Sequence, residues 1–286
     1  MVAISDTPIP EHLLDIDFVA AGKAATRFLG CNPRTDQPGA SCPFFGEVFR
    51  DRIIPRSDWD SYLEQLDPNF GRLDHYQHDQ DGEGTCTGNA GCASVEQKWA
   101  EKYGTDYAIS LSPPSVYQFC ARSANSGSTT NCILKRLREN GAVPIHNEQN
   151  RKVLATLELD TSHMIREVGW NQNVRGMEET MSQFRIDEFY EIRNVDEFFS
   201  ALLYGFPILY GRAGHAIKGT DLVKRAGTYA CKYRNSWGQW GDGGYGYDTL
   251  DYILRTNGAY GAFAVQTLRA PKNEHLLISA PPVTTS

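Results

Sequence analysis

Four residues of this 286-residue chain carry side chains suited to thiol-based hydrolysis. Gln80 stands six residues before Cys86, and Asn235 stands twenty residues after His215. A thiol becomes a strong nucleophile only when it is ionised, and both the positive end of a helix dipole and a nearby imidazolium lower its pKa. Thr85 suits an N-cap, so we expect Cys86 in the first turn of a helix, where the dipole acts on it.

Three short motifs resemble those of papain-like cysteine peptidases. Asn-Ser-Trp-Gly at 235–238, followed by Trp-Gly-Asp-Gly-Gly-Tyr, is similar to the stretch that holds the family's asparagine. Gly-His-Ala-Ile at 214–217 resembles its His-Ala-Val segment, and the Gln80-to-Cys86 spacing is that between its oxyanion-hole glutamine and its nucleophile. A lone cysteine or histidine is usually structural. Here the three motifs stand in the order found in the family, and the resemblance spans residues 51–270. The chain most resembles a divergent microbial or phage-type member of the family.

The resemblance implies a reaction and a role for each residue. Peptide bonds would be hydrolysed through a thioester on Cys86, with His215 acting first as base and then as acid. Asn235 would hold the imidazole, and Trp237 would shield that hydrogen bond from water. Gln80 would donate its side-chain amide to the oxyanion, together with a backbone N–H. The implied partner is a protein or peptide substrate, and neither a cofactor nor a metal is implied.

Several positions depart from the family's pattern. Residues 86–90 read Cys-Thr-Gly-Asn-Ala where the family has Cys-Trp-Ala-Phe. Residues 127–132 replace its Cys-Asn-Gly-Gly loop, which pairs with the substrate backbone. Gln239 alone separates the two parts of the asparagine motif, where two residues are usual, and Glu83 replaces a cysteine of the family's disulfide framework.

Two further stretches suggest rival sites. Cys92 is a second candidate nucleophile, but the residue six before it is Cys86 rather than a glutamine, and Cys92 would lie inside the helix. Residues 241–246 are rich in glycine but lack the Lys-Ser/Thr of a phosphate-binding loop. We therefore expect neither a nucleophile at Cys92 nor a nucleotide site.

A possible metal-ligand set lies just before the candidate nucleophile. Its members are His75, His78, Asp79, Asp81 and Glu83. The stretch has neither a ligand-loop pattern nor a helix cap, so we interpret it as a solvated loop rather than a metal site.

Composition excludes several classes of function. The net charge of -7 and the absence of a Lys/Arg run argue against a nucleic-acid partner. No apolar stretch approaches the roughly 20 residues that cross a bilayer. The N-terminal residues show no basic leader followed by an apolar segment, so we expect a protein that is cytoplasmic or carried in a particle.

The seven cysteines leave the redox state open, because one free nucleophile with up to three bridges and seven reduced thiols both fit. They stand at positions 31, 42, 86, 92, 120, 132 and 231. Cys31 with Cys42 and Cys120 with Cys132 are the local pairs that loop sequence favours. We expect a mostly reduced protein.

The pattern of elements predicts an α+β fold. Helices are expected from Cys86 to Gly104, from Ser112 with Val116 and Phe119 inward, after Asn131, and after a cap at Asn194. Strands are expected at 208–210, 215–223, 229–234 and 262–268, and the resemblance adds an opening strand at 53–60. A helical half and a sheet half match the two-lobed papain-like fold, with a β-barrel-like second lobe and the active site in the cleft between them.

We expect residues 1–50 to form an extended N-terminal arm packed on the body, since 50 residues bury little core alone. The peptidase domain would span 51–270, with a helical lobe at about 84–150 and a β lobe at about 151–270. A loosely held tail would span 271–286. Phe44, Phe45 and Phe49 would dock the arm or face a partner. Whether the arm covers the Cys86 cleft is open.

A second function fits the missing leader, the altered substrate loop and the long arm. The fold could serve as a structural or binding component of a phage particle or another assembly, with or without residual activity. A role of that kind does not require all four of the residues that suit thiol chemistry.

Overall fold

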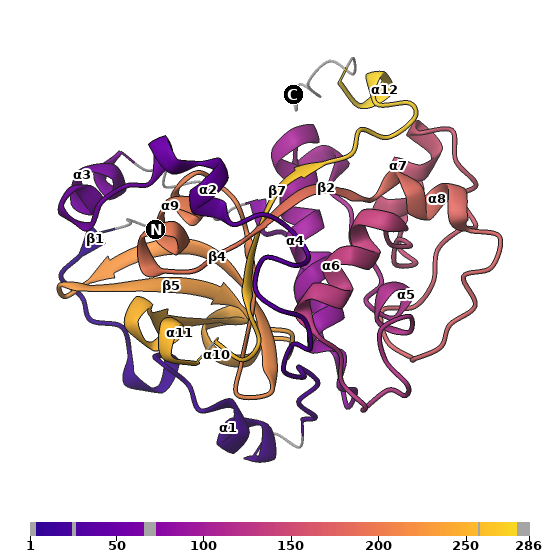
Figure 1. Ribbon diagram of the computed structural model, residues 1–286. Coiled ribbons are helices and arrows are strands. Elements are labelled where there is room, and N and C mark those ends of the chain that lie inside the picture. Colours follow the sequence, from indigo (N-terminus) through magenta and orange to yellow (C-terminus); the bar gives the residue numbers. More distant parts are fainter. Residues whose placement is uncertain (1–3, 25–26, 66–72, 257, 279–286) are drawn as a thin grey trace.

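The structure is a computed structural model that describes residues 4–24, 27–65, 73–256 and 258–278. A helical half and a half built on one sheet lie side by side, and β2 and β7 reach from the sheet towards the helices (Figure 1). The helices are α1 (Phe18–Ala24), α2 (Phe45–Val48), α3 (Trp59–Glu64), α4 (Cys86–Tyr103), α5 (Pro114–Tyr117), α6 (Thr130–Glu139), α7 (Glu148–Thr156), α8 (Glu178–Gln183), α9 (Val195–Leu203), α10 (Trp240–Gly243), α11 (Leu250–Thr256) and α12 (His275–Ile278). The strands are β1 (Ile4–Ser5), β2 (Ile186–Glu191), β3 (Ile208–Arg212), β4 (His215–Arg225), β5 (Thr228–Arg234), β6 (Tyr245–Thr249) and β7 (Ala262–Leu268).

The long helix α4 is the element around which the helical half packs. It begins at Cys86, and Gly104 follows its last residue with a φ of 80°, a conformation that glycine adopts without strain. Small residues let neighbouring elements approach it closely. A Cβ on Gly91 would lie 2.5 Å from Ile133 Cγ2 of α6. The helix predicted from Cys86 is therefore confirmed, although the Thr85 side chain makes no capping hydrogen bond.

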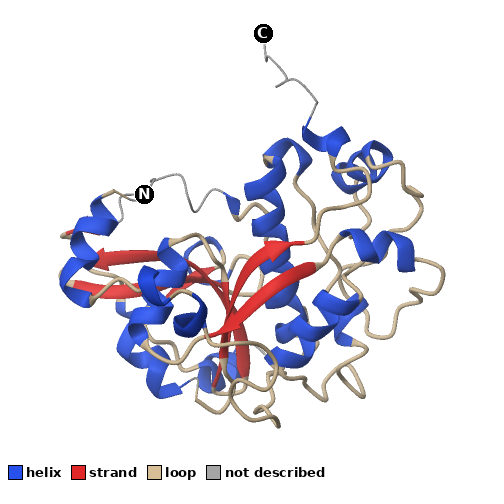
Figure 2. Ribbon diagram, turned by 45° about the horizontal axis from the view of Figure 1, so that its top comes forward, coloured by secondary structure: helices blue, strands red, loops and turns tan. Residues whose placement is uncertain are grey.

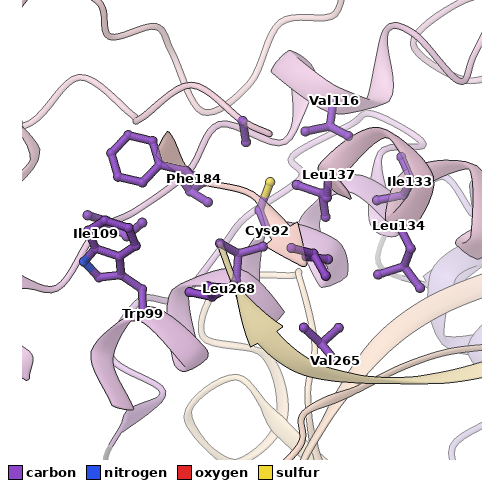
Figure 3. Packing of buried hydrophobic residues seen from close by; sticks show 14 of the residues in the cluster. Cys92, Trp99, Ile109, Val116, Ile133, Leu134, Leu137, Phe184, Val265 and Leu268 are labelled. Atoms are coloured by element: carbon purple, nitrogen blue, oxygen red, sulfur yellow. The ribbon is translucent and has the colours of Figure 1, made fainter. Parts of the chain in front are cut away.

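An apolar cluster joins α4 to α5, α6, α7 and the ends of β2 and β7. Figure 3 shows Cys92 and Trp99 of α4 among side chains of α5, α6 and β7. Cys92 is fully buried, and burial raises the pKa of its thiol well above the usual value. It is therefore a core side chain, remote from solvent.

The strands form one sheet in the order β2-β7-β3-β4-β5-β6, with β1 parallel to β4. Strand neighbours in this path are antiparallel. The path is open, with β2 and β6 at its two ends, so the barrel-like description is not confirmed. Figure 2 shows the strands crossing the middle of the molecule with helices on either side.

The predicted opening strand at 53–60 is wrong. This segment instead turns into α3, and the Trp59 indole stacks on Phe199 of α9 at 4.1 Å. Its Nε1–H donates to the Ile54 carbonyl at 3.1 Å, and the Ile54 N–H donates to Ser200 Oγ at 2.9 Å. Side chains of Ser200 on α9 and of Trp59 on α3 thus satisfy the Ile54 backbone groups that a strand would have paired.

The other predicted elements agree with the structure except at their ends. The helices after Ser112, Asn131 and Asn194 and all four strands are present, and the Asn194 side chain caps α9. Phe119 is the error within them, because its ring is 46% exposed rather than inward. The guanidinium of Arg136 covers that ring at 5.2 Å.

The arm contains short helices that the sequence pattern did not predict, and it contacts the body along its length. Leu13 packs with Tyr247 on β6, and the fully buried Phe45 ring lies 6.0 Å from Phe206. Phe49 packs beside it against Tyr190 at 5.0 Å. Two of the three phenylalanines at the end of the arm therefore face the core of the protein.

The cysteines pair only in part as expected. Cys120 and Cys132 form a disulfide, whereas Cys31 and Cys42, the other local pair that the loop sequence favours, are free and buried. The other three cysteines are also free, in agreement with the expectation of a mostly reduced protein. The pKa of each of the Cys31 and Cys42 thiols is raised by burial.

The described part of the tail is held on α4. Glu274 accepts from the Tyr103 hydroxyl at 2.9 Å, and Leu277 is buried. The expectation of a loosely held tail is therefore wrong for residues 271–278, and residues 279–286 lie outside the described chain. Within the part of the chain that the structure describes, no helix combines the length and apolarity needed to span a membrane.

The close contact between α4 and α6 predicts the effect of a methyl group at position 91. Gly91→Ala should destabilise the fold by about 1–2 kcal/mol, because overpacking at Ile133 and Leu137 exceeds the gain in helix propensity. Urea unfolding measures the change. Gly82→Ala is the matched control, since nothing lies within 4 Å of its added Cβ. A Gly91→Ala variant at least as stable as the parent would contradict the packing described.

Candidate functional site

A tight turn places His215 at the start of β4. Arg212 and His215 face each other across the β3–β4 pair, and Ala213 and Gly214 between them have φ values of 46° and 80°. Positive φ at both central residues is the geometry of a two-residue hairpin turn. Because Asn235 directly follows the paired strand β5, the sheet brings the two side chains together.

The imidazole of His215 is hydrogen-bonded to Asn235. Its Nε2–H donates to Asn235 Oδ1 at 2.8 Å, and both residues are buried. The indole of Trp237 lies 5.0 Å from the imidazole ring and is also buried. His215 Nδ1, the other ring nitrogen, has no hydrogen-bond partner among the described residues. One nitrogen of the imidazole is thus held by a hydrogen bond, and the other has no hydrogen-bond partner among the described residues.

Cys86 lies at the first position of α4 and is fully buried. Burial raises the pKa of its thiol to about 11, although backbone N–H groups of Ala216, Gly30 and Thr87 favour the thiolate. Burial likewise lowers the pKa of His215 to about 4. Both groups are therefore neutral at pH 7 in this structure, in contrast to the ionised thiol expected from the helix dipole and an adjacent imidazolium.

The side-chain amide of Gln80 is fully occupied. Its Nε2 donates to the carbonyl of Phe28 at 3.0 Å and to that of Glu83 at 2.6 Å. Its Oε1 accepts from the Ser236 hydroxyl at 2.6 Å. The backbone of Gln80 also donates to the Ser236 carbonyl, at 2.9 Å. Gln80 thus lies beside the asparagine motif, but a carbonyl of the N-terminal arm holds the donor that the sequence analysis assigns to an oxyanion.

Residues 27–32 of the arm, which we call the strap, run across the site. The Arg27 guanidinium pairs with Asp79 at 2.9 Å at one end of the strap. At the other end, the Cys31 N–H donates to the Gly214 carbonyl at 2.8 Å, and the Ser128 N–H donates to the Gly30 carbonyl at 2.8 Å. The strap therefore contacts the turn before His215 and the loop at 127–132, which stands in place of the substrate-pairing loop of the resemblance.

Gly30 is the residue of the strap that passes closest to the start of α4. A Cβ built on it would lie 1.6 Å from the Gly84 carbonyl oxygen, which is backbone and cannot rotate away. The Gly30 N–H also favours the Cys86 thiolate. The backbone of the strap thus packs against the residues just before α4 at a point where only glycine fits.

A buried ionic network lies behind Gln80. His78 Nε2 is 3.0 Å from Glu96 Oε1, and His78 Nδ1 is 3.1 Å from Glu167 Oε1. Glu167 also accepts from the Asp79 N–H at 3.1 Å and from the Tyr76 hydroxyl at 2.9 Å. The interpretation of this stretch as a solvated loop is therefore wrong at His78.

The residues of the possible metal-ligand set have separate partners. His75 Nε2 contacts the Ile109 carbonyl, and Asp79 pairs with Arg27. Glu83 accepts from the N–H groups of residues 169–170. No cluster of three His, Cys, Asp or Glu side chains suited to a metal ion occurs among the described residues.

A second buried cluster was missed by the sequence analysis. Asp74 pairs with Lys218 at 2.6 Å and with Arg234 at 2.8 Å, and it accepts from the Tyr245 hydroxyl at 3.0 Å. Asp74 therefore connects β4, β5 and β6, and one of its partners, Arg234, directly precedes Asn235. The sequence does indicate that Glu96 of the His78 network is buried, since helical spacing places it on the inward face of α4. No local sequence pattern indicates the burial of Asp74 or the contact of Glu167 with His78.

No family model matches the chain, and no curated protein matches it. Solved structures do. Xylellain, a cysteine protease from Xylella fastidiosa, matches with 16% identity and a TM-score of 0.56, over 85% of this chain and 98% of that one. Procathepsin L2 from the Tenebrio molitor larval midgut matches with 15% identity and a TM-score of 0.58, over 85% and 79%. Procathepsin B from Trypanosoma congolense matches with 14% identity and a TM-score of 0.54, over 85% and 88%.

The chain has the papain-like fold. At these identities the likeness concerns the fold alone, which in this chain joins helices to an open sheet. Within the papain-like fold, Cys86 begins α4 of the helical half and His215 begins β4 of the sheet, and the backbone of Ala216, next to His215, favours the Cys86 thiolate.

The His78 network predicts a pH-dependent contribution to stability. Burial disfavours the imidazolium, but Glu96 and Glu167 outweigh it and raise the pKa of His78 to about 9. A folded-state pKa above the unfolded value of about 6.5 means that the stabilisation is complete below pH 6.5 and is lost as the pH rises through about 9.

His78→Gln should therefore cost about 3 kcal/mol near pH 6, because the buried Glu96 and the partly exposed Glu167 lose their cation, and clearly less near pH 10. Urea unfolding at the two pH values measures the difference. The exposed His146, replaced by Gln, is the control. An equal loss at both pH values would contradict the charged state assigned to His78.

Proposed function

We propose that this protein is a cysteine peptidase that hydrolyses peptide or isopeptide bonds through a thioester on Cys86. The observation that carries the proposal is the buried His215–Asn235 hydrogen bond, set beside a cysteine at the start of the central helix of a papain-like fold. The Gln80 amide beside this site adds a donor suited to an oxyanion.

In this mechanism, His215 Nδ1 takes the proton of the Cys86 thiol, and the sulfur attacks the substrate carbonyl carbon. The carbonyl oxygen becomes an oxyanion that accepts from Gln80 Nε2 and the Cys86 backbone N–H. The imidazolium then protonates the leaving nitrogen, the C–N bond breaks, and a thioester remains. Water, deprotonated by His215, hydrolyses the thioester and restores the thiol. Asn235 keeps the imidazole in one orientation throughout.

The arrangement described is the self-blocked state of this peptidase. The strap places the Phe28 carbonyl on the Gln80 donor and covers Cys86 with the backbone of Gly30. Burial keeps both the thiol and the imidazole neutral, and the Gly30 backbone of the strap lies against that thiol. When the strap leaves, water and substrate reach the pair, the desolvation cost falls, and the thiolate–imidazolium pair becomes accessible.

The close approach of Gly30 provides the test of this function. Gly30→Ala should expel the strap, because about 1–3 kcal/mol of overpacking raises the open population about 5- to 150-fold. The measurements are the rate at which an epoxide thiol inhibitor labels the protein under reducing conditions, with the adduct mapped, and the rate of hydrolysis of an unfolded protein substrate. Both rates should rise together, with the adduct on Cys86.

Two controls accompany this test. Gly82→Ala adds a methyl group in open space two residues before Gly84 and should leave both rates at the parent value. Cys92, buried in the same helix, should stay unlabelled in every variant. An adduct on Cys92, or none in the Gly30→Ala chain, would contradict the proposed function and point to the scaffold role.

A further inference from the structure

Phe18, the first residue of α1, belongs to the arm but is fully buried in the body. Its ring centroid lies 4.5 Å from that of the His215 imidazole, with the two planes at 56°. It also lies 5.4 Å from the Trp237 ring, edge to face. Tyr233 and Trp240 complete its surroundings, each at 5.9 Å. An aromatic side chain of the arm thus forms part of the wall that holds the imidazole.

Phe18 also contacts a buried charge. The guanidinium carbon of Arg212 lies 4.4 Å from the Phe18 ring centroid, and Arg212 is fully buried. The pKa of His215 is lowered first by burial and then by the positive charge of Arg212. The negative face of an aromatic ring attracts cations, so Phe18 is placed to offset this repulsion when the imidazole is protonated.

The segment that carries Phe18 is fixed to the body independently of the strap. The Asp15 N–H donates to the Tyr247 carbonyl at 2.8 Å, and its carboxylate accepts from the N–H and hydroxyl of Thr249 at 2.7 and 2.9 Å. Asp17 caps α1 by accepting from the N–H groups of residues 19–20. None of these contacts involves residues 27–32, and the strap's own bond to α1, from the Arg27 N–H to the Gly22 carbonyl at 2.8 Å, lies more than one helical turn from Phe18. We therefore expect release of the strap to leave Phe18 in place.

We propose that Phe18 is a positioning residue for His215, which fixes the plane of the imidazole and stabilises the imidazolium formed when the thiol of Cys86 loses its proton. The inference rests on the proposed function and divides the arm into two parts with opposite effects. The strap blocks the site, whereas the segment up to Phe18 completes it. Activation therefore requires release of the strap with the contacts of α1 retained, and loss of the whole arm does not produce a competent site.

The charged and titratable groups around the imidazole come from four elements of the body. Arg212 lies on β3 with Asp248 of β6 at 3.0 Å, Tyr233 lies on β5, and Cys86 begins α4. Phe18 itself adds no charge. An effect of changing Phe18 to another uncharged residue therefore reflects packing and the aromatic face rather than a new ionic contact.

The test compares variants in the full chain carrying Gly30→Ala. Phe18→Leu keeps the side chain apolar but removes the aromatic face, and Phe18→Tyr keeps it. The rate of Cys86 alkylation by iodoacetamide is measured against pH, with the adduct mapped. In Phe18→Leu the thiolate should appear about half a pH unit higher, because a less stable imidazolium lowers the thiol pKa less. Phe18→Tyr should keep the parent profile even if its buried hydroxyl lowers the melting temperature.

Phe45→Leu is the matched control, since Phe45 is another fully buried arm phenylalanine, but its aromatic neighbours are Phe49, Tyr190 and Phe206. It should lower the melting temperature and leave the alkylation profile unchanged. An unchanged profile in Phe18→Leu, or an equal shift in Phe18→Tyr or Phe45→Leu, overturns this inference and leaves the proposed function standing. A Cys86 that reacts at no pH in the Gly30→Ala parent overturns both.

Discussion

The hydrogen bond between His215 and Asn235 is the interaction on which the rest of the site depends. A single neutral hydrogen bond in water contributes little, but this one is buried beneath Trp237 and Phe18, where an exchange with water is not available. It fixes the tautomer of the imidazole, since Nε2 carries the proton and Nδ1 is left as the acceptor. The β3–β4 turn and the pairing of β4 with β5 bring its two partners together.

Burial explains why the same groups are inert in the arrangement described. A thiol and an imidazole without water both favour their neutral forms. The Gly30 backbone of the strap lies against the Cys86 thiol, and Phe18 and Trp237 pack on the His215 ring. The strap also places a backbone carbonyl on the Gln80 donor, so in the proposed mechanism it would block both attack and oxyanion stabilisation. The glycine at position 30 makes this close fit possible, because any side chain there would overlap the Gly84 carbonyl. One short segment can thus control the whole site without changing its framework.

Local patterns predicted much of this structure. Helical spacing and its end signals located α4, and strand patterns located β3, β4, β5 and β7. The segment at 53–60 failed because the buried Trp59 stacks on Phe199 of α9 and the Ile54 N–H donates to Ser200 of the same helix, and these contacts override its strand-like composition. The role of His78 was missed because one of its partners, Glu167, lies 89 residues away, with nothing local to indicate it. The path of the strap was open for a similar reason, since it depends on backbone contacts with segments far along the chain.

We propose above all that Cys86 forms a covalent acyl intermediate once the strap is displaced. The most direct measurement mixes the Gly30→Ala chain with a p-nitrophenyl ester and follows both the release of nitrophenolate and the intact mass. The account predicts a rapid burst of about one equivalent with the acyl group on Cys86, abolished by Cys86→Ala and much slower in His215→Ala. Nitrophenolate released without a burst, or an acyl group found elsewhere while Cys86 stays free, would contradict it.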